Sequence, residues 1–143
     1  MLVRLKTIVV EKPWGRTDIP HDFGDFGDRR IGEVWFAHPA GDAAPIMVKF
    51  LFTSERLSIQ VHPDDDDAQA AGFARGKEEC WLILDAQPGA ELGVGLNVAT
   101  TREALRDDAL DGSIVDMIDW RPSKSGDFVY NRAATIHAIG GGL

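Results

Sequence analysis

The chain has 143 residues, of which 44% are hydrophobic and 27% charged, a composition typical of a folded domain with its own core. The formal net charge of −8 argues against sequence-independent binding to nucleic acid, which requires a basic surface. No run is long and apolar enough to span a bilayer, the first residues lack a signal-peptide core, and the single cysteine excludes an internal disulfide. We therefore expect one domain over residues 1–143, located in the cytoplasm, with no nucleic-acid or membrane partner.

Short apolar segments separated by Gly/Pro turns follow one another along most of the chain, a pattern typical of an all-β sandwich or barrel. Turns are expected at 12–15, 39–45, 88–89 and 126–127, and an irregular loop over 18–30. Strands are predicted over residues 6–10, 31–36, 46–52, 57–62, 79–84, 91–98, 119–122, 128–130 and 135–139.

A small helical insertion is expected between the strands. A short helix is predicted over residues 66–75, and a helical turn over 113–117. Thr100 and Glu103 form a capping-box pattern, which predicts a helix that begins there and ends near Asp108.

The segment 57–62 alternates between apolar and polar residues without a break. Because strand side chains alternate between two faces, Ser58, Gln60 and His62 share one face, and Pro63 ends the strand since it lacks an N–H. Such a polar face ordinarily meets water, which is the alternative interpretation. Gln60 and His62 nevertheless both carry atoms that can bind a metal ion.

Two further polar residues lie in apolar surroundings. Glu79 begins a strand that is otherwise almost wholly apolar, and a buried carboxylate needs a partner because an unpaired buried charge is costly. His137 also lies in an apolar strand, where a hydrogen-bonded core histidine is the alternative. One metal ion would satisfy Gln60, His62, Glu79 and His137 together. Nitrogen and oxygen donors suit zinc, and also Mn, Co or Fe.

Several motifs occur in order over essentially the whole chain: KPWG at 12–15, GEVW at 32–35, VKFL at 48–51, QVHPDD at 60–65, GKEECW at 76–81, GDF at 126–128 and TIHAIG at 135–140. Together they resemble the type I mannose-6-phosphate isomerases of the cupin superfamily. The resemblance implies an antiparallel β-barrel of jelly-roll type that binds zinc. It also implies a zinc-dependent aldose–ketose isomerase that interconverts mannose 6-phosphate and fructose 6-phosphate through a cis-enediol.

The resemblance further implies that the zinc ligands are Gln60, His62, Glu79 and His137. It directs attention to Lys77, Lys49 and Glu33 as catalytic residues, and to Ser58 and Lys77 as substrate-binding residues. Each has a plainer alternative: a strand serine for Ser58, a solvent-exposed turn lysine for Lys77, an outward-facing strand lysine for Lys49, and a surface ion pair with arginine for Glu33. The catalytic base stays unassigned.

The chain departs from the family in two ways. Arg132 and Ala134 replace a proline and a glycine before the last ligand, and alanine adopts a left-handed conformation less readily than glycine. We therefore expect an altered approach to His137; Arg132 is either an added cation or a surface arginine. The chain also ends soon after His137, without the family's further strands and active-site arginine. An open barrel edge that pairs with a second copy, or a shortened form with weak or no activity, is expected.

Three hypotheses follow. The chain is a metal-dependent sugar-phosphate isomerase, a non-catalytic metal-binding cupin that binds a sugar phosphate, or a cupin whose metal only stabilises the fold. Ligand binding compared with turnover separates the first two. Loss of stability on metal removal, without sugar-phosphate binding, identifies the third.

Overall fold

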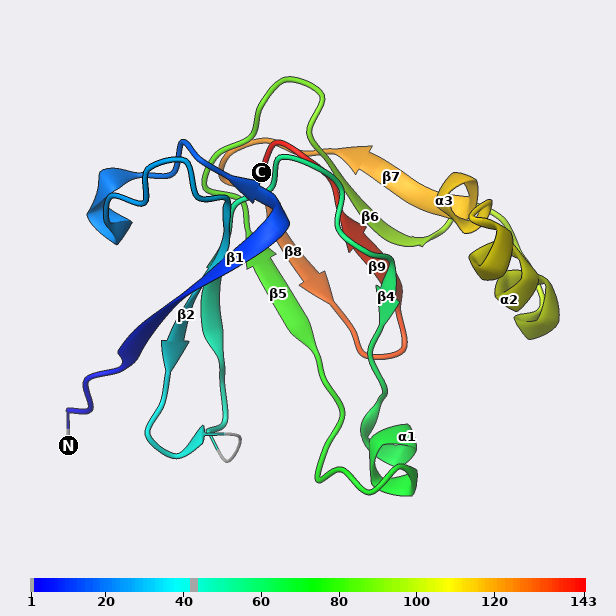
Figure 1. Cartoon of the computed structure of the whole chain (residues 1–143). Helices are drawn as coiled ribbons and strands as arrows, with labels where there is room; N and C mark the ends of the chain where they lie inside the picture. Colours follow the sequence, from blue (N-terminus) through cyan, green and yellow to red (C-terminus); the bar gives the residue numbers. More distant parts are fainter. Residues whose placement is uncertain (1, 42–43) are drawn as a thin grey trace.

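Antiparallel strands dominate the computed structural model, which describes residues 2–41 and 44–143 (Figure 1). Residues 42–43 of the turn expected at 39–45 lie outside the described residues. None of the described helices is long and apolar enough to cross a membrane. The strands are β1 (Lys6–Arg16), β2 (Ile31–Ala37), β3 (Val48–Leu51), β4 (Gln60–Val61), β5 (Glu79–Leu82), β6 (Glu91–Leu96), β7 (Ile118–Pro122), β8 (Phe128–Asn131) and β9 (Ile136–Ile139). The helices are η1 (His21–Phe23), α1 (Asp65–Ala70), α2 (Arg102–Asp111) and α3 (Ile114–Met117).

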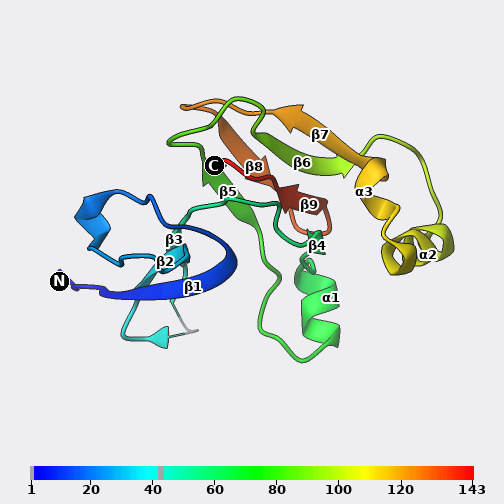
Figure 2. The ribbon, with the colours of Figure 1, turned by 45° about the horizontal axis from the view of Figure 1, so that its top comes forward.

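Within the described ranges, the strands pair into antiparallel sheets of order β1-β2-β3, β4-β9-β6-β7 and β5-β8. Figures 1 and 2 both show the β5–β8 pair between the other two sheets, with α2 and α3 beyond the outer strand β7. The predicted all-β architecture with a short helical insertion is thus confirmed. Strand pairing among these residues does not run from sheet to sheet, so the predicted barrel is not closed.

The first sheet packs against the loop that precedes β2. Ile31 and Val34 of β2 are fully buried, and they cluster with Ile19 of the loop, which is 9% exposed. Phe23 meets the ring of Phe50 on β3 edge-on, with centroids 4.8 Å apart. The segment expected to be irregular, 18–30, therefore contains the short helix η1 and supplies part of a hydrophobic core.

Strand β1 is longer than predicted, because it continues through the segment expected to be a turn at 12–15. Its register with β2 shifts between Val10 and Glu11 and again before Arg16, so the extra residues form an irregular bulge in the strand. A Cβ on Gly15 would lie 2.6 Å from the carbonyl carbon of Ile31, which only glycine avoids.

Strand β4 is shorter than the predicted strand 57–62. Ladder pairing with β9 covers only Gln60 opposite His137 and Val61 opposite Ile136. The segment before it still follows β9, since the Leu57 amide donates to the Ile139 carbonyl at 2.8 Å. The other predicted strands are present, with ends shifted by no more than two residues.

The helix predictions are partly wrong at their ends. Helix α1 ends before Ala71, and Gly72 with φ of +86° leaves the helical conformation, so the helix does not reach residue 75. The N-cap of α2 is Thr101 rather than Thr100, because the Thr101 hydroxyl accepts from the Ala104 amide at 3.1 Å. This helix continues past Asp108 until Gly112, which is left-handed. Helix α3 confirms the predicted helical turn.

Candidate metal centre

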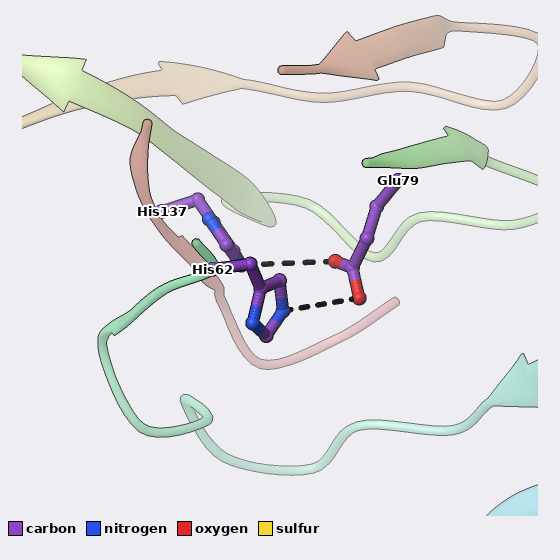
Figure 3. Close-up of side chains that lie close together, drawn as sticks. All are labelled: His62, Glu79 and His137. Carbon is purple, nitrogen blue, oxygen red and sulfur yellow. Dashed lines mark ion pairs between the residues drawn. The ribbon is translucent and has the colours of Figure 1, made fainter. Parts of the chain in front are cut away.

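Three of the predicted ligands meet at one point (Figure 3). His62 directly follows β4, Glu79 begins β5 and His137 lies on β9, so residues from two sheets converge. The His62 Nε2 atom lies 3.2 Å from Glu79 Oε1, and His137 Nε2 lies 3.6 Å from Glu79 Oε2. One ligand atom from each residue can be chosen so that all three lie within 4.8 Å of one another.

Backbone contacts explain why His62 and Glu79 come together although they are distant in sequence. The Lys77 amide donates to the Pro63 carbonyl at 3.0 Å, and the Gly76 amide donates to the Asp65 carboxylate at 2.8 Å. A Cβ on Gly76 would lie 2.5 Å from the carbonyl carbon of Asp64, so this close approach requires glycine. The segment before Glu79 is thereby fixed against the segment after His62.

The turn before β9 joins the third ligand to the first. The Ala134 amide donates to the His62 carbonyl at 2.7 Å. Ala134 has φ of 60°, the left-handed conformation that costs a non-glycine residue about 1–2 kcal/mol. The expected difficulty at this position is therefore present, and the backbone accommodates it while it places His137 in the cluster.

The backbone contact of His137 fixes the tautomer of its neutral ring. Its Nδ1 atom lies 2.8 Å from the Thr135 carbonyl, which can only accept, so Nδ1 carries the proton and donates. The Nε2 lone pair is then directed to the cluster. A backbone carbonyl that orients an imidazole in this way is typical of metal-binding histidines. The ring is 4% exposed and is contacted edge-on by Trp81, with centroids 5.5 Å apart.

Lys77 lies against two of the three ligands. Its ammonium is 2.9 Å from Glu79 Oε1 and 3.0 Å from His62 Nε2. Burial lowers the pKa of His62, and the Lys77 charge lowers it further, which favours the neutral imidazole that metals bind. Burial alone would raise the pKa of Glu79, but the hydrogen bond and charge of Lys77, with both histidines, bring this pKa below its usual value. Two neutral imidazoles and one carboxylate form a donor set that fits a divalent transition metal.

The curated proteins that resemble this chain are mannose-6-phosphate isomerases. No protein-family model matches the chain. The chain is 38% identical over 120 residues to the mannose-6-phosphate isomerase ManA of Bacillus subtilis (strain 168). The aligned region covers 79% of this chain and 38% of that protein. The chain is 36% identical over 108 residues to the mannose-6-phosphate isomerase of Streptococcus mutans serotype c (strain ATCC 700610 / UA159), covering 76% of this chain and 34% of that protein.

A solved structure shows the same likeness. The crystal structure of the mannose 6-phosphate isomerase from Bacillus subtilis matches with a TM-score of 0.79 and 28% identity, over 96% of this chain and 55% of that chain. The chain is a relative of the type I mannose-6-phosphate isomerases. Its all-β fold is therefore of the cupin type predicted from the motifs. It spans 38% and 34% of the length of the two curated relatives described above.

Gln60, the predicted fourth ligand, stands directly opposite His137 in the β4–β9 ladder. Opposite residues of antiparallel strands share a face, so the strand pairing directs Gln60 to the His137 side. Its Nε2 donates to the Ser58 hydroxyl at 3.0 Å. The isomerase-like roles of Gln60 as a ligand and Ser58 as a substrate-binding residue stay predictions.

Glu33 and Lys49, the other predicted catalytic residues, are joined to each other across β2 and β3. Lys49 Nζ donates to the buried Glu33 carboxylate at 2.8 Å, and the Trp35 indole N–H donates to it at 3.2 Å. Lys12 Nζ lies 3.9 Å from the same carboxylate. The partners of Glu33 are therefore lysines and a tryptophan, not the surface arginine considered as an alternative, and its catalytic role stays a prediction.

Asn131 is a residue of this region that was not predicted as a site residue. This residue is 1% exposed and stands directly opposite Glu79 in the β5–β8 ladder. Its carboxamide oxygen is buried and has no hydrogen-bond partner within the described residues. The strand predicted over residues 128–130 leaves out Asn131, which belongs to a residue type that is common in turns.

Proposed function

We propose that the chain belongs to an isomerase that interconverts mannose 6-phosphate and fructose 6-phosphate with the aid of zinc. The observation that carries the proposal is the convergence of His62, Glu79 and His137, with the Lys77 ammonium beside them. The names of the relatives support the choice of substrate.

In this proposal the zinc ion is held by His62, Glu79 and His137, with Gln60 as the fourth ligand. When bound, zinc supplies a Lewis acid that stabilises negative charge developing on the sugar oxygens. The Thr135 carbonyl holds the His137 ring in the tautomer that leaves Nε2 free.

The protein residues around the ion bind and orient the sugar phosphate. The Lys77 ammonium, on a side chain that is 54% exposed, provides a positive charge for the phosphate or for the reacting oxygens. Ser58 contributes a hydroxyl to substrate binding, and Lys49 and Glu33 contribute further charged groups to catalysis. The reaction moves a proton between C1 and C2 of the sugar, through a cis-enediol, with positioned acid and base groups.

A coupled isomerase assay on mannose 6-phosphate with added zinc tests the proposal. We expect turnover in the wild-type chain and none in His62→Ala, because that change removes one imidazole ligand. The matched control is His21→Ala, since His21 lies in η1 and outside the cluster; its turnover should equal that of the wild type.

Two outcomes contradict the isomerase. Bound metal by elemental analysis, with sugar-phosphate binding but no turnover, would identify a non-catalytic binding protein. A metal whose removal lowers the Tm, without any sugar-phosphate binding, would identify a structural metal.

A further inference from the structure

Asn131 presents a buried oxygen that the described protein does not satisfy. Its side chain is almost completely buried at 1% exposure, and the oxygen Oδ1 makes no hydrogen bond to any described residue. An unpaired acceptor in the protein interior is costly, and buried carboxamides are therefore almost always paired. Such an atom indicates a partner that belongs to the site but not to the polypeptide.

The ladder places this oxygen beside the metal centre. Asn131 and Glu79 are directly opposite on β8 and β5, so their side chains share a face and their Cβ atoms are about 5 Å apart. The Glu79 carboxylate extends from this position to His62 and His137. A carboxamide oxygen and an ionised carboxylate are both acceptors, so they cannot satisfy each other. A cation between them satisfies both.

The burial of the Asn131 oxygen bears on which partner it can have. The Asn131 oxygen is closed to a water-sized sphere. A divalent metal bonds to oxygen at about 2.0–2.2 Å, well within the distance at which a water oxygen would lie. Direct coordination by a metal ion would place the partner closer to this oxygen than a hydrogen-bonded water would lie.

We propose that the Asn131 carboxamide oxygen is a further oxygen donor to the cation held by His62, Glu79 and His137. The inference rests on the metal centre of the proposed function, but not on its turnover. It adds a neutral ligand from β8, so that the site draws on four separate strands or their ends.

Zinc and cobalt(II) binding to the purified chain tests this role. Asn131→Leu keeps a similar volume but removes the oxygen. We expect its affinity for zinc, measured by competition with a chromophoric chelator, to fall by about 10- to 100-fold. Its metal-free Tm should be equal to or above that of the wild type, because the unpaired polar group is gone. The visible spectrum of bound cobalt(II) should change, because the number of ligands changes.

Asn131→Asp retains an oxygen at the same position and should bind zinc at least as tightly as the wild type. If circular dichroism shows that Asn131→Leu does not fold, Asn131→Asp becomes the test of the proposal. Weaker zinc binding by Asn131→Asp than by the wild type would overturn it. A folded Asn131→Leu with wild-type zinc affinity and an unchanged cobalt(II) spectrum would also overturn it. His62→Ala should lose zinc binding. If the wild-type chain binds neither zinc nor cobalt(II), the proposed metal centre is wrong as a whole. That outcome is distinct from one in which the wild-type chain binds metal but Asn131 is not a ligand.

Discussion

Ala134 combines local strain with a position next to the candidate ligands. It holds a left-handed conformation with φ of 60° while its amide donates to the His62 carbonyl. Glycine would adopt this conformation without the clash of a Cβ atom. Strain at this residue is thus built into the turn that leads to His137.

We expect Ala134→Gly to raise the free energy of unfolding by about 1 kcal/mol, since the removal of strain exceeds the added entropy of the unfolded chain. Urea denaturation measures the change. The matched control is the neighbouring Ala133→Gly, which lies outside the left-handed region and should lower stability by about 0.5–1 kcal/mol. Equal effects of the two substitutions would contradict the assigned strain.

The residues of the candidate site differ in how far the sequence reveals them. His62, Glu79 and His137 could be proposed from the sequence because one metal ion would satisfy all three, although His62 and His137 each also have an ordinary alternative role. Lys77 is recognisable because it lies two residues before Glu79. Asn131 is not recognisable in this way, since its burial and its pairing with Glu79 depend on where β8 ends.

At the level of elements, strand β2 carries the buried carboxylate of Glu33, which is stabilised by side chains of β2 and β3. The Glu33 carboxylate is 6% exposed and receives hydrogen bonds from Lys49 on β3 and from Trp35 on β2. Removal of one partner of a buried pair leaves the other charge uncompensated. The pairing of β2 with β3 therefore includes an electrostatic contribution in addition to the ladder.

Glu33→Gln should lower the free energy of unfolding by about 1–3 kcal/mol, reduced from the fully buried case because Lys49 is partly exposed. Thermal and urea denaturation test the value. The control Glu11→Gln removes an exposed pair with Arg29 and should change stability by less than about 1 kcal/mol. Similar losses in both variants would argue against a special role for the β2 charge. Loss of turnover in a folded Glu33→Gln would support its catalytic role.

The presence of the strands could be predicted, but their lengths depend on partners elsewhere in the chain. β1 extends through Arg16 because bulges let it follow β2 beyond the expected turn. β4 is reduced to Gln60–Val61 because only these residues meet β9. Alternation of side chains is a local property, whereas a ladder requires two segments, so the sequence pattern predicts the first more reliably than the second.

At the scale of the whole molecule, the β5–β8 sheet carries an exposed apolar face. Leu82 is opposite Phe128, and these side chains are 59% and 64% exposed. Cys80 and Tyr130 form the next exposed pair on the same face. Contiguous exposed apolar side chains indicate an interaction surface.

We expect the chain to self-associate through this face, which differs from the pairing of an open barrel edge expected from the sequence. Sedimentation velocity over a range of concentrations tests the expectation. The double variant Leu82→Glu with Phe128→Lys places opposite charges across the ladder and should remain monomeric. Leu110→Glu, at a 78% exposed position on α2, is the control and should associate like the wild type. A wild-type chain that stays monomeric at every concentration would contradict the expectation.

The family and the all-β class could be predicted for the whole molecule because they depend on many short motifs. The division into three sheets could not, since it depends on the choice of partners, such as β9 between β4 and β6. Gln60 and Asn131, which both carry a carboxamide, illustrate the difference between what motifs predict and what strand pairing decides. The first lies within a motif, and the second gains its position only from the pairing of β5 with β8.

The place of the Lys77 ammonium links two binding events. It donates to the same His62 nitrogen and lies against the same Glu79 oxygen that a divalent cation would use. In the proposed metal centre, loading would therefore exchange one cation for another rather than fill a free position. The displaced ammonium becomes available to an anion, so metal and phosphate affinities should increase together. By thermodynamic reciprocity, a sugar phosphate that engaged Lys77 in the proposed isomerase would also favour retention of the metal.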